Sequence, residues 1–164
     1  APMTETIKTN IVIKSADETD FAPLTVKCSK KGYSCRSDET DPDEITMALT
    51  YNGIQYVGKG TDYLMADALA DLQTQLPHDA LLCCCMTCRH GNMCPYGNRP
   101  GIIFCTKGHC IQSTDDLLQF WDRGNDASSE TPSFAYCDMF EYQDKDHFTY
   151  NDYIHFLSAK NGRK

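Results

Sequence analysis

The sequence predicts an α+β fold, in which a small antiparallel sheet with a packed helix is followed by a loop-rich half with short helices. Three observations lead to this expectation: strand-like alternation near the start, a turn dipeptide between two apolar segments, and a cysteine cluster among glycines and prolines. A chain of 164 residues can form one compact unit. Within it we expect an α+β subdomain over residues 3–80 and a cysteine-rich subdomain over residues 81–164.

Strands are expected in the first part of the chain. Residues 10–14 and 24–28 alternate between apolar and polar side chains, as strands with one buried face do. Residues 45–51 and 54–58 flank the dipeptide Asn52-Gly53, which supplies the two positive φ angles of a type I′ turn. These two segments are therefore predicted to form a hairpin.

A helix is expected after the hairpin. Thr61 can cap its start, and Pro77 marks its end. Between them, apolar residues recur at helical spacing and form one stripe: Met65, Leu69, Leu72 and Leu76. This helix should pack across the sheet.

Short helices and one strand are predicted in the last third of the chain. Ser113 or Thr114 can cap a short helix, and residues 123–133 are polar enough to form a mobile connection. Residues 134–142 are predicted as a final strand. Residues 149–152 resemble a capping box that opens a second short helix.

The net charge and the lengths of the apolar segments limit the kinds of partner that the protein can bind. The net charge of −8 repels a phosphate backbone, which argues against nucleic acid as a partner. No apolar segment reaches the roughly 18 to 20 residues that a membrane helix needs, and no secretory leader is visible. We therefore expect a soluble, cytoplasmic protein that binds a protein partner.

The ten cysteines are the strongest chemical signal. Cys85 and Cys88 have the C-x2-C spacing that lets two thiolates bind one metal ion from a single turn. Cys94 and Cys105 complete the simplest set of four metal ligands. Other residues can replace members of this set: Cys84, Cys110, Cys137, His90 and His109.

Some cysteines are expected to pack in the core instead of binding metal. Neighbouring side chains on extended backbone point to opposite sides, so Cys83, Cys84 and Cys85 cannot all face one ion. One or two of them should be buried as small apolar groups. Packing is also the expectation for Cys28 and Cys35, which lie far away in sequence.

The segment from Cys83 to Gln112 contains no acidic residue, and its charged side chains are Arg89, Arg99 and Lys107. Cations beside thiolates offset the negative charge of a metal–thiolate site. We therefore expect these three residues to lie around the ligands. The competing interpretation is a basic patch that binds an acidic partner.

Several chemistries remain open for the cysteines. Structural zinc is favoured, because four thiolates would close a tetrahedron and stabilise loops that lack a core of their own. A 4Fe–4S cluster uses the same ligands, and Cys94-Pro95 is typical of ferredoxins. An even number of cysteines also permits disulfides, and soft thiolates near methionines would suit cuprous copper.

The segment Cys84–Asn98, together with residues 103–105 and 148–153, resembles a group of uncharacterised small cysteine-rich bacterial proteins. The resemblance spans Ile45 onward and implies a bacterial origin but no activity.

The expected function is therefore a structural zinc site that supports a protein-interaction surface. An iron–sulfur protein for electron transfer or redox sensing is the alternative. A thiol enzyme, in which His90 or His109 activates a cysteine, is the second alternative, and the main expectation is not an enzyme.

Overall fold

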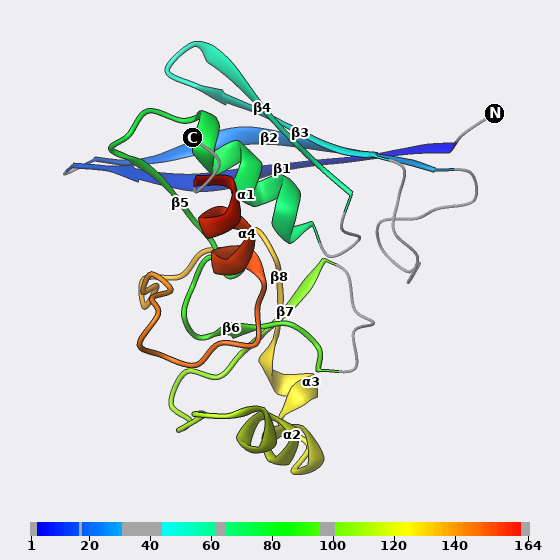
Figure 1. Cartoon of the computed structure of the whole chain (residues 1–164), viewed down its shortest axis with the longest axis vertical. Coiled ribbons are helices and arrows are strands. Elements are labelled where there is room, and N and C mark those ends of the chain that lie inside the picture. The colour runs from blue at the N-terminus through cyan, green and yellow to red at the C-terminus, as the bar shows by residue number, and fades with distance from the viewer. Residues whose placement is uncertain (1–2, 17, 31–43, 62–64, 96–100, 162–164) are drawn as a thin grey trace.

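The computed structural model describes residues 3–16, 18–30, 44–61, 65–95 and 101–161. It is a mixed α+β fold in which sheet predominates. Figure 1 shows the main sheet at one end of the molecule, one helix against it and a second helix beside the first, then a small second sheet and two short helices at the far end. Cys35 and Arg99 lie outside the described residues.

The main sheet has five antiparallel strands in the order β4-β3-β2-β1-β5. The first two strands pair along their whole length, from Met3↔Lys30 to Ser15↔Glu18, and extend well beyond the predicted strands at 10–14 and 24–28. The bounds are β1 Met3–Ser15, β2 Glu18–Lys30, β3 Glu44–Tyr51, β4 Ile54–Gly60 and β5 Ala80–Cys83.

The predicted hairpin is confirmed. β3 and β4 pair up to Tyr51↔Ile54, and the two turn residues Asn52 and Gly53 have φ angles of 52° and 76°. Both angles are positive, as a type I′ turn requires, and this turn matches the twist of the flanking strands.

Helix α1, Ala66–Gln75, packs against the main sheet, and its predicted apolar stripe is buried. The close approach depends on Gly58 of β4, because a Cβ there would lie 2.5 Å from the backbone nitrogen of Leu72. The predicted cap at Thr61 is wrong. The helix starts later, after Met65 with φ 69°, and the Thr61 amide donates to Asp67 Oδ2 at 2.8 Å instead.

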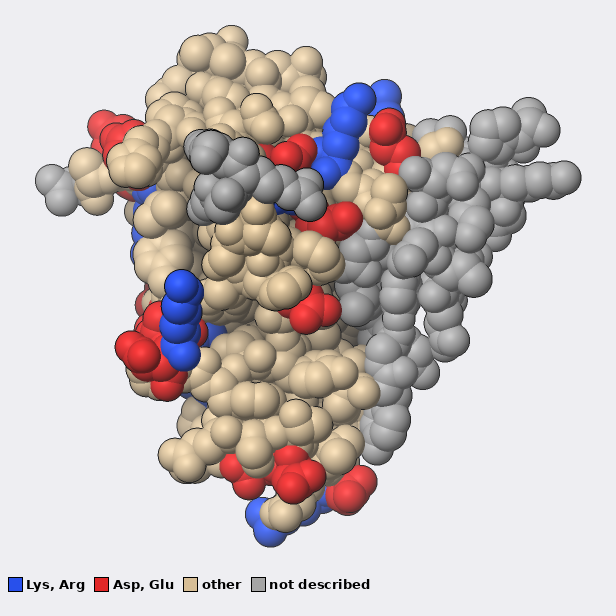
Figure 2. Space-filling view, in the orientation of Figure 1, with Lys and Arg blue, Asp and Glu red and all other residues tan. Residues whose placement is uncertain are grey.

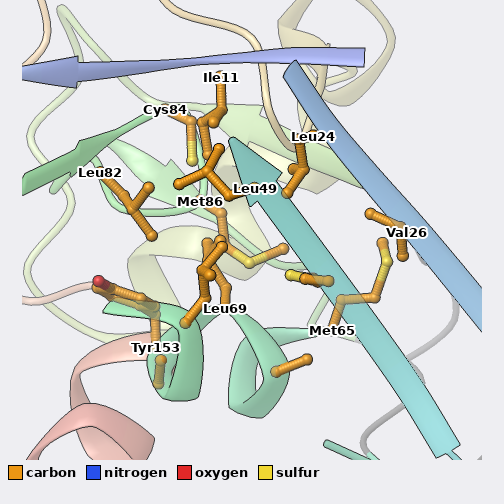
Figure 3. Close-up of a cluster of buried hydrophobic side chains, with 14 of the residues drawn as sticks. Ile11, Leu24, Val26, Leu49, Met65, Leu69, Leu82, Cys84, Met86 and Tyr153 are labelled. Atoms are coloured by element: carbon orange, nitrogen blue, oxygen red, sulfur yellow. The ribbon is translucent and has the colours of Figure 1, made fainter. Parts of the chain in front are cut away.

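The core joins the two halves of the chain. Side chains from the sheet and α1 form one buried cluster with Cys84, Met86, Met93, Ile103 and Tyr153 from the second half. Figure 3 shows Cys84, Met86 and Tyr153 beside Leu69 and Leu82. No linker separates the halves, because β5 lies in the main sheet and leads directly into the cysteine segment.

In the second half, the described residues form a three-stranded sheet in the order β6-β7-β8 and three short helices. The predicted cap of α2 is confirmed, since Ser113 Oγ accepts a hydrogen bond from the Asp116 amide at 3.2 Å. The bounds are β6 Gly91–Asn92, β7 Ile102–Cys105, β8 Glu130–Pro132, α2 Thr114–Asp122, α3 Asp126–Ser129 and α4 Tyr153–Asn161.

Three expectations for this half are wrong. Residues 123–133 contain α3 and β8, and are not merely a polar connection. Residues 134–142 form turns, with only the isolated bridge between Cys88 and Tyr142 within the described ranges. Thr149 does not cap α4, because its hydroxyl donates to the Arg89 carbonyl oxygen at 3.0 Å.

Within the described ranges, no helix is long and apolar enough to cross a lipid bilayer.

Candidate cysteine site

The C-x2-C pair lies in a series of tight turns after β5. Three backbone hydrogen bonds define these turns. The Thr87 amide donates to the Cys84 carbonyl at 3.0 Å, and the Cys88 amide donates to the Cys85 carbonyl at 3.4 Å. The Gly91 amide donates to the Cys88 carbonyl at 3.0 Å. Position 91 requires glycine, because a Cβ there would collide with the carbonyl oxygen of Cys85. This winding brings Cys85 and Cys88 to the same side of the turn.

Two cysteines from distant parts of the chain lie beside this turn. Cys105 is the last residue of β7 and pairs with Gly91 of β6. Cys137 follows a segment that runs along the turn, where the Cys85 amide donates to the Ala135 carbonyl at 2.8 Å. A second bond of 3.0 Å joins the Met86 amide to the Ser133 carbonyl. Three separate segments therefore meet at the C-x2-C pair.

These cysteines line one small pocket of about 20 Å³ that exposes only apolar surface. Burial raises the pKa of the Cys85 thiol, and the Cys88, Cys137 and Cys105 thiols raise it further by charge repulsion, while a 3.4 Å contact with Thr131 Oγ1 lowers it. The three neighbouring thiols therefore lie within electrostatic range of the Cys85 sulfur. The pocket lining is Cys84, Cys85, Cys88, Gly91, Cys105, Tyr136, Cys137 and Phe140.

The other two cysteines of the consecutive run are buried. Cys84 is fully enclosed in the apolar core, where burial raises the pKa of its thiol to about 12. Figure 3 shows its sulfur among the core side chains. The Cys83 sulfur lies 2.9 Å from the Tyr142 hydroxyl, and burial raises the pKa of this thiol too.

The remaining cysteines lie elsewhere. Cys94 is buried but does not line the pocket, Cys110 is exposed, and Cys28 is a residue of β2 whose side chain is buried in the core. Among the described residues, no three His, Cys, Asp or Glu side chains stand close enough to hold a metal ion as they are placed. Metal binding at the pocket therefore requires its thiols to turn inward.

Near the site, Arg89 and His90 bind one carboxylate, and Lys107 binds a backbone carbonyl. Arg89 Nε lies 2.9 Å from Glu141 Oε2, and His90 Nε2 lies 2.6 Å from the same oxygen. The hydrogen bond from His90, aided by the charge of Arg89, lowers the pKa of Glu141. Lys107 Nζ donates to the Met139 carbonyl at 3.3 Å. On the face drawn in Figure 2, Lys and Arg side chains stand apart from one another and near acidic ones.

Sequence reasoning missed the polar side chains that support the turn. Asn151 Nδ2 donates to the carbonyls of Met86 at 2.7 Å and Gly91 at 3.2 Å. Gln143 Nε2 donates to the carbonyls of Met86 at 3.0 Å and Cys88 at 3.3 Å. These bonds join residues more than fifty positions apart, so no local pattern in the sequence marks them.

The chain matches the model of a known protein family. A family model described as a family of unknown function, DUF6304, matches residues 4–91, which is more than half of the chain. The matched segment covers the main sheet, α1 and the C-x2-C pair. No curated protein matches the chain.

Proposed function

The chain belongs to the family of unknown function DUF6304, which brings no activity with it, and we propose from its geometry that it is a zinc-binding protein. In this proposal Cys85, Cys88, Cys105 and Cys137 bind one structural Zn²⁺. The ion holds a protein-interaction surface in place. The observation that carries the proposal is that these four thiols, from three separate segments, line a single pocket.

The donor set suits zinc. Structural zinc sites are four-coordinate and tetrahedral, and four cysteines are one of their usual ligand sets. To bind the ion, the four thiols must turn into the pocket and approach one another, because Zn–S bonds are about 2.3 Å long. Thr131 Oγ1, already 3.4 Å from the Cys85 sulfur, supplies an outer hydrogen bond of the kind that orients metal ligands.

The size of the pocket favours a single ion over a cluster. A volume of about 20 Å³ is little more than the roughly 10–15 Å³ that a cavity needs to hold one water molecule. A 4Fe–4S cluster has a core of eight atoms, so it would have to push the turn and the segment around Cys137 apart. The iron–sulfur alternative, with electron transfer or redox sensing as its function, therefore has less support from the geometry.

The proposed ion would stabilise the irregular segment around Cys137. Residues 133–140 form no helix or strand, and their described backbone bonds to the C-x2-C turn are those of Ser133 and Ala135. A ligand at Cys137 ties the far end of this segment to β7 and the turn. Metal binding then contributes directly to folding of the second half.

Metal analysis of the purified chain tests the proposal. We expect about one zinc per chain and no iron or acid-labile sulfide. Cys88→Ser and Cys137→Ser should each abolish stoichiometric binding, because a structural site needs all four ligands. Cys110→Ser is the matched control, since Cys110 is exposed and does not line the pocket. A wild-type chain free of zinc, or full zinc content in both pocket variants, would contradict the proposal. Iron with sulfide would support the alternative.

A further inference from the structure

Among the described residues, no strand pairs with the middle part of the outer edge of β1. β5 pairs with β1 only from Val12↔Cys83 to Ser15↔Ala80, so within the described residues the edge from Thr6 to Ile11 meets no other strand. In antiparallel pairing, every second residue directs its backbone N–H and C=O to one neighbour and the residues between direct theirs to the other side. This edge therefore presents a row of backbone donors and acceptors.

A large groove runs along the same edge. Its volume is about 1080 Å³, and β1 lines it with Ile7, Thr9, Asn10 and Val12. Successive residues of a strand point to opposite faces, so a groove that touches both odd- and even-numbered residues must follow the edge of the strand. Residues 132–138 form the facing wall. Figure 1 shows β5 beside only one end of the much longer β1.

The shape and chemistry of the groove point to one kind of occupant. We propose that an extended peptide segment of a partner protein binds in this groove as an added strand on β1. The groove exceeds the roughly 300 to 1,000 Å³ of ordinary small-molecule pockets, and an extended chain can pair with the open backbone edge. Phe21, which is 72% exposed at the groove, offers an apolar contact for alternate side chains of the peptide.

Polar groups that line the groove indicate which residue types the bound peptide should contain. Asp138 is the charged residue in the described lining, and the whole chain carries −8, so a peptide with a basic residue is favoured. Ser133 is 2% exposed and lines the groove, and its hydroxyl has no hydrogen-bond partner among the described groups. A buried hydroxyl is normally paired, so a bound peptide would supply the missing partner.

The groove is connected to the cysteine pocket. Tyr136 and Cys137 line both, so a metal ion on Cys137 would fix the wall that faces β1. In this respect the inference rests on the proposed zinc site. It identifies the interaction surface that the metal supports.

Selection from a phage-displayed library of random decapeptides tests the inference with the full, zinc-supplemented chain. Enriched peptides should alternate apolar residues and contain a basic one. Phe21→Ser should weaken binding of an enriched peptide about tenfold, as loss of a central aromatic contact does. Ile54→Ser is the matched control, because Ile54 is also a large exposed apolar side chain but lies at the opposite edge of the sheet. Methylating alternate peptide amides should abolish binding, because it removes the backbone donors.

The outcomes separate the two proposals. Zinc-loaded protein that selects no peptide above the Phe21→Ser background overturns the inference alone. Groove-dependent peptide binding to a chain that holds no zinc overturns the proposed function alone. Binding that tolerates amide methylation in both registers overturns strand addition. Concentration-dependent dimers that Phe21→Ser dissolves would identify a second copy of the chain as the occupant, which also overturns the inference.

Discussion

The side-chain oxygen of Asn92 accepts a 2.8 Å hydrogen bond from the backbone amide of Tyr150. The amide group of Asn92 donates to Thr106 Oγ1 at 3.0 Å, and the Met93 amide donates to the Tyr150 carbonyl at 2.7 Å. Asn92 is 1% exposed, so these bonds form away from water. They join β6, the segment after β7 and the segment before α4 without any metal.

Asn92→Ala should therefore lower the free energy of unfolding by about 1–3 kcal/mol for each buried group that it leaves unpaired. Urea unfolding followed by circular dichroism measures the change. Gln55→Ala, on the exposed surface of β4, is the control and should change stability by less than about 0.5 kcal/mol. Equal urea midpoints for Asn92→Ala and the wild type would show that these hydrogen bonds make no net contribution to the free energy of unfolding.

The consecutive cysteines should respond differently to substitution. Cys84→Ala removes a buried sulfur from the core and should cost about 1 kcal/mol while zinc content stays unchanged. Cys85→Ala should eliminate stoichiometric zinc, because this thiol is only partly buried and lies within electrostatic range of the other proposed ligands, whereas Cys84 also lines the pocket but is fully enclosed in the core. Parallel metal analysis and thermal unfolding distinguish the two. Zinc loss in Cys84→Ala with retention in Cys85→Ala would reverse the assignment.

Gly91→Ala should be strongly destabilising. The added Cβ collides with the Cys85 carbonyl and crowds the Ile103 side chain, and the backbone must shift to relieve it. Overpacking of this kind costs about 1–3 kcal/mol, and the shift would also displace the C-x2-C turn. Gly108→Ala is the control for backbone strain alone, because Gly108 has φ 87° and open space around its Cβ position. A larger loss of stability in Gly108→Ala would contradict this account.

Removal of metal should loosen one part of the molecule. With a strong chelator, amide hydrogen exchange should accelerate at residues 85–91 and 133–140, where the proposed ligands lie. Exchange in β2 and β3 should stay slow, because these strands are held by the sheet and its apolar core. Uniform acceleration through the main sheet would mean that the metal controls global stability. If exchange does not accelerate after metal loss is confirmed, the metal does not stabilise either of these segments.

Local signals in the sequence are sufficient to predict the β3–β4 hairpin and the buried face of α1. Asn52-Gly53 determines its own backbone angles, and the spacing of Leu69 and Leu72 defines the buried face of the helix. The start of α1 differs from the expectation because Thr61 is a good cap by residue type alone. In the structure its backbone amide is bound by Asp67, so the chain reaches the helix through Met65.

Long-range contacts explain what the sequence does not predict. The strand expected at 134–142 does not form because backbone groups of Ala135 and Glu141 bond individually to Cys85 and Arg89. The same bonds carry Cys137 to the pocket. Spacing along the chain favours Cys94 as a neighbour of Cys88, but proximity in sequence contains no information about which distant segment folds back onto a turn.

Residues 84–93 obtain many of their hydrogen-bond partners from Gln143, Thr149, Tyr150 and Asn151, which the ribosome adds long after the turn itself. During synthesis, the β1 to β5 sheet has all of its strands available before any of these partners has emerged. The nascent chain must therefore pass through a stage in which the sheet can assemble while Cys85 and Cys88 remain unshielded. At that stage both thiols are accessible to passing metal ions and to oxidants.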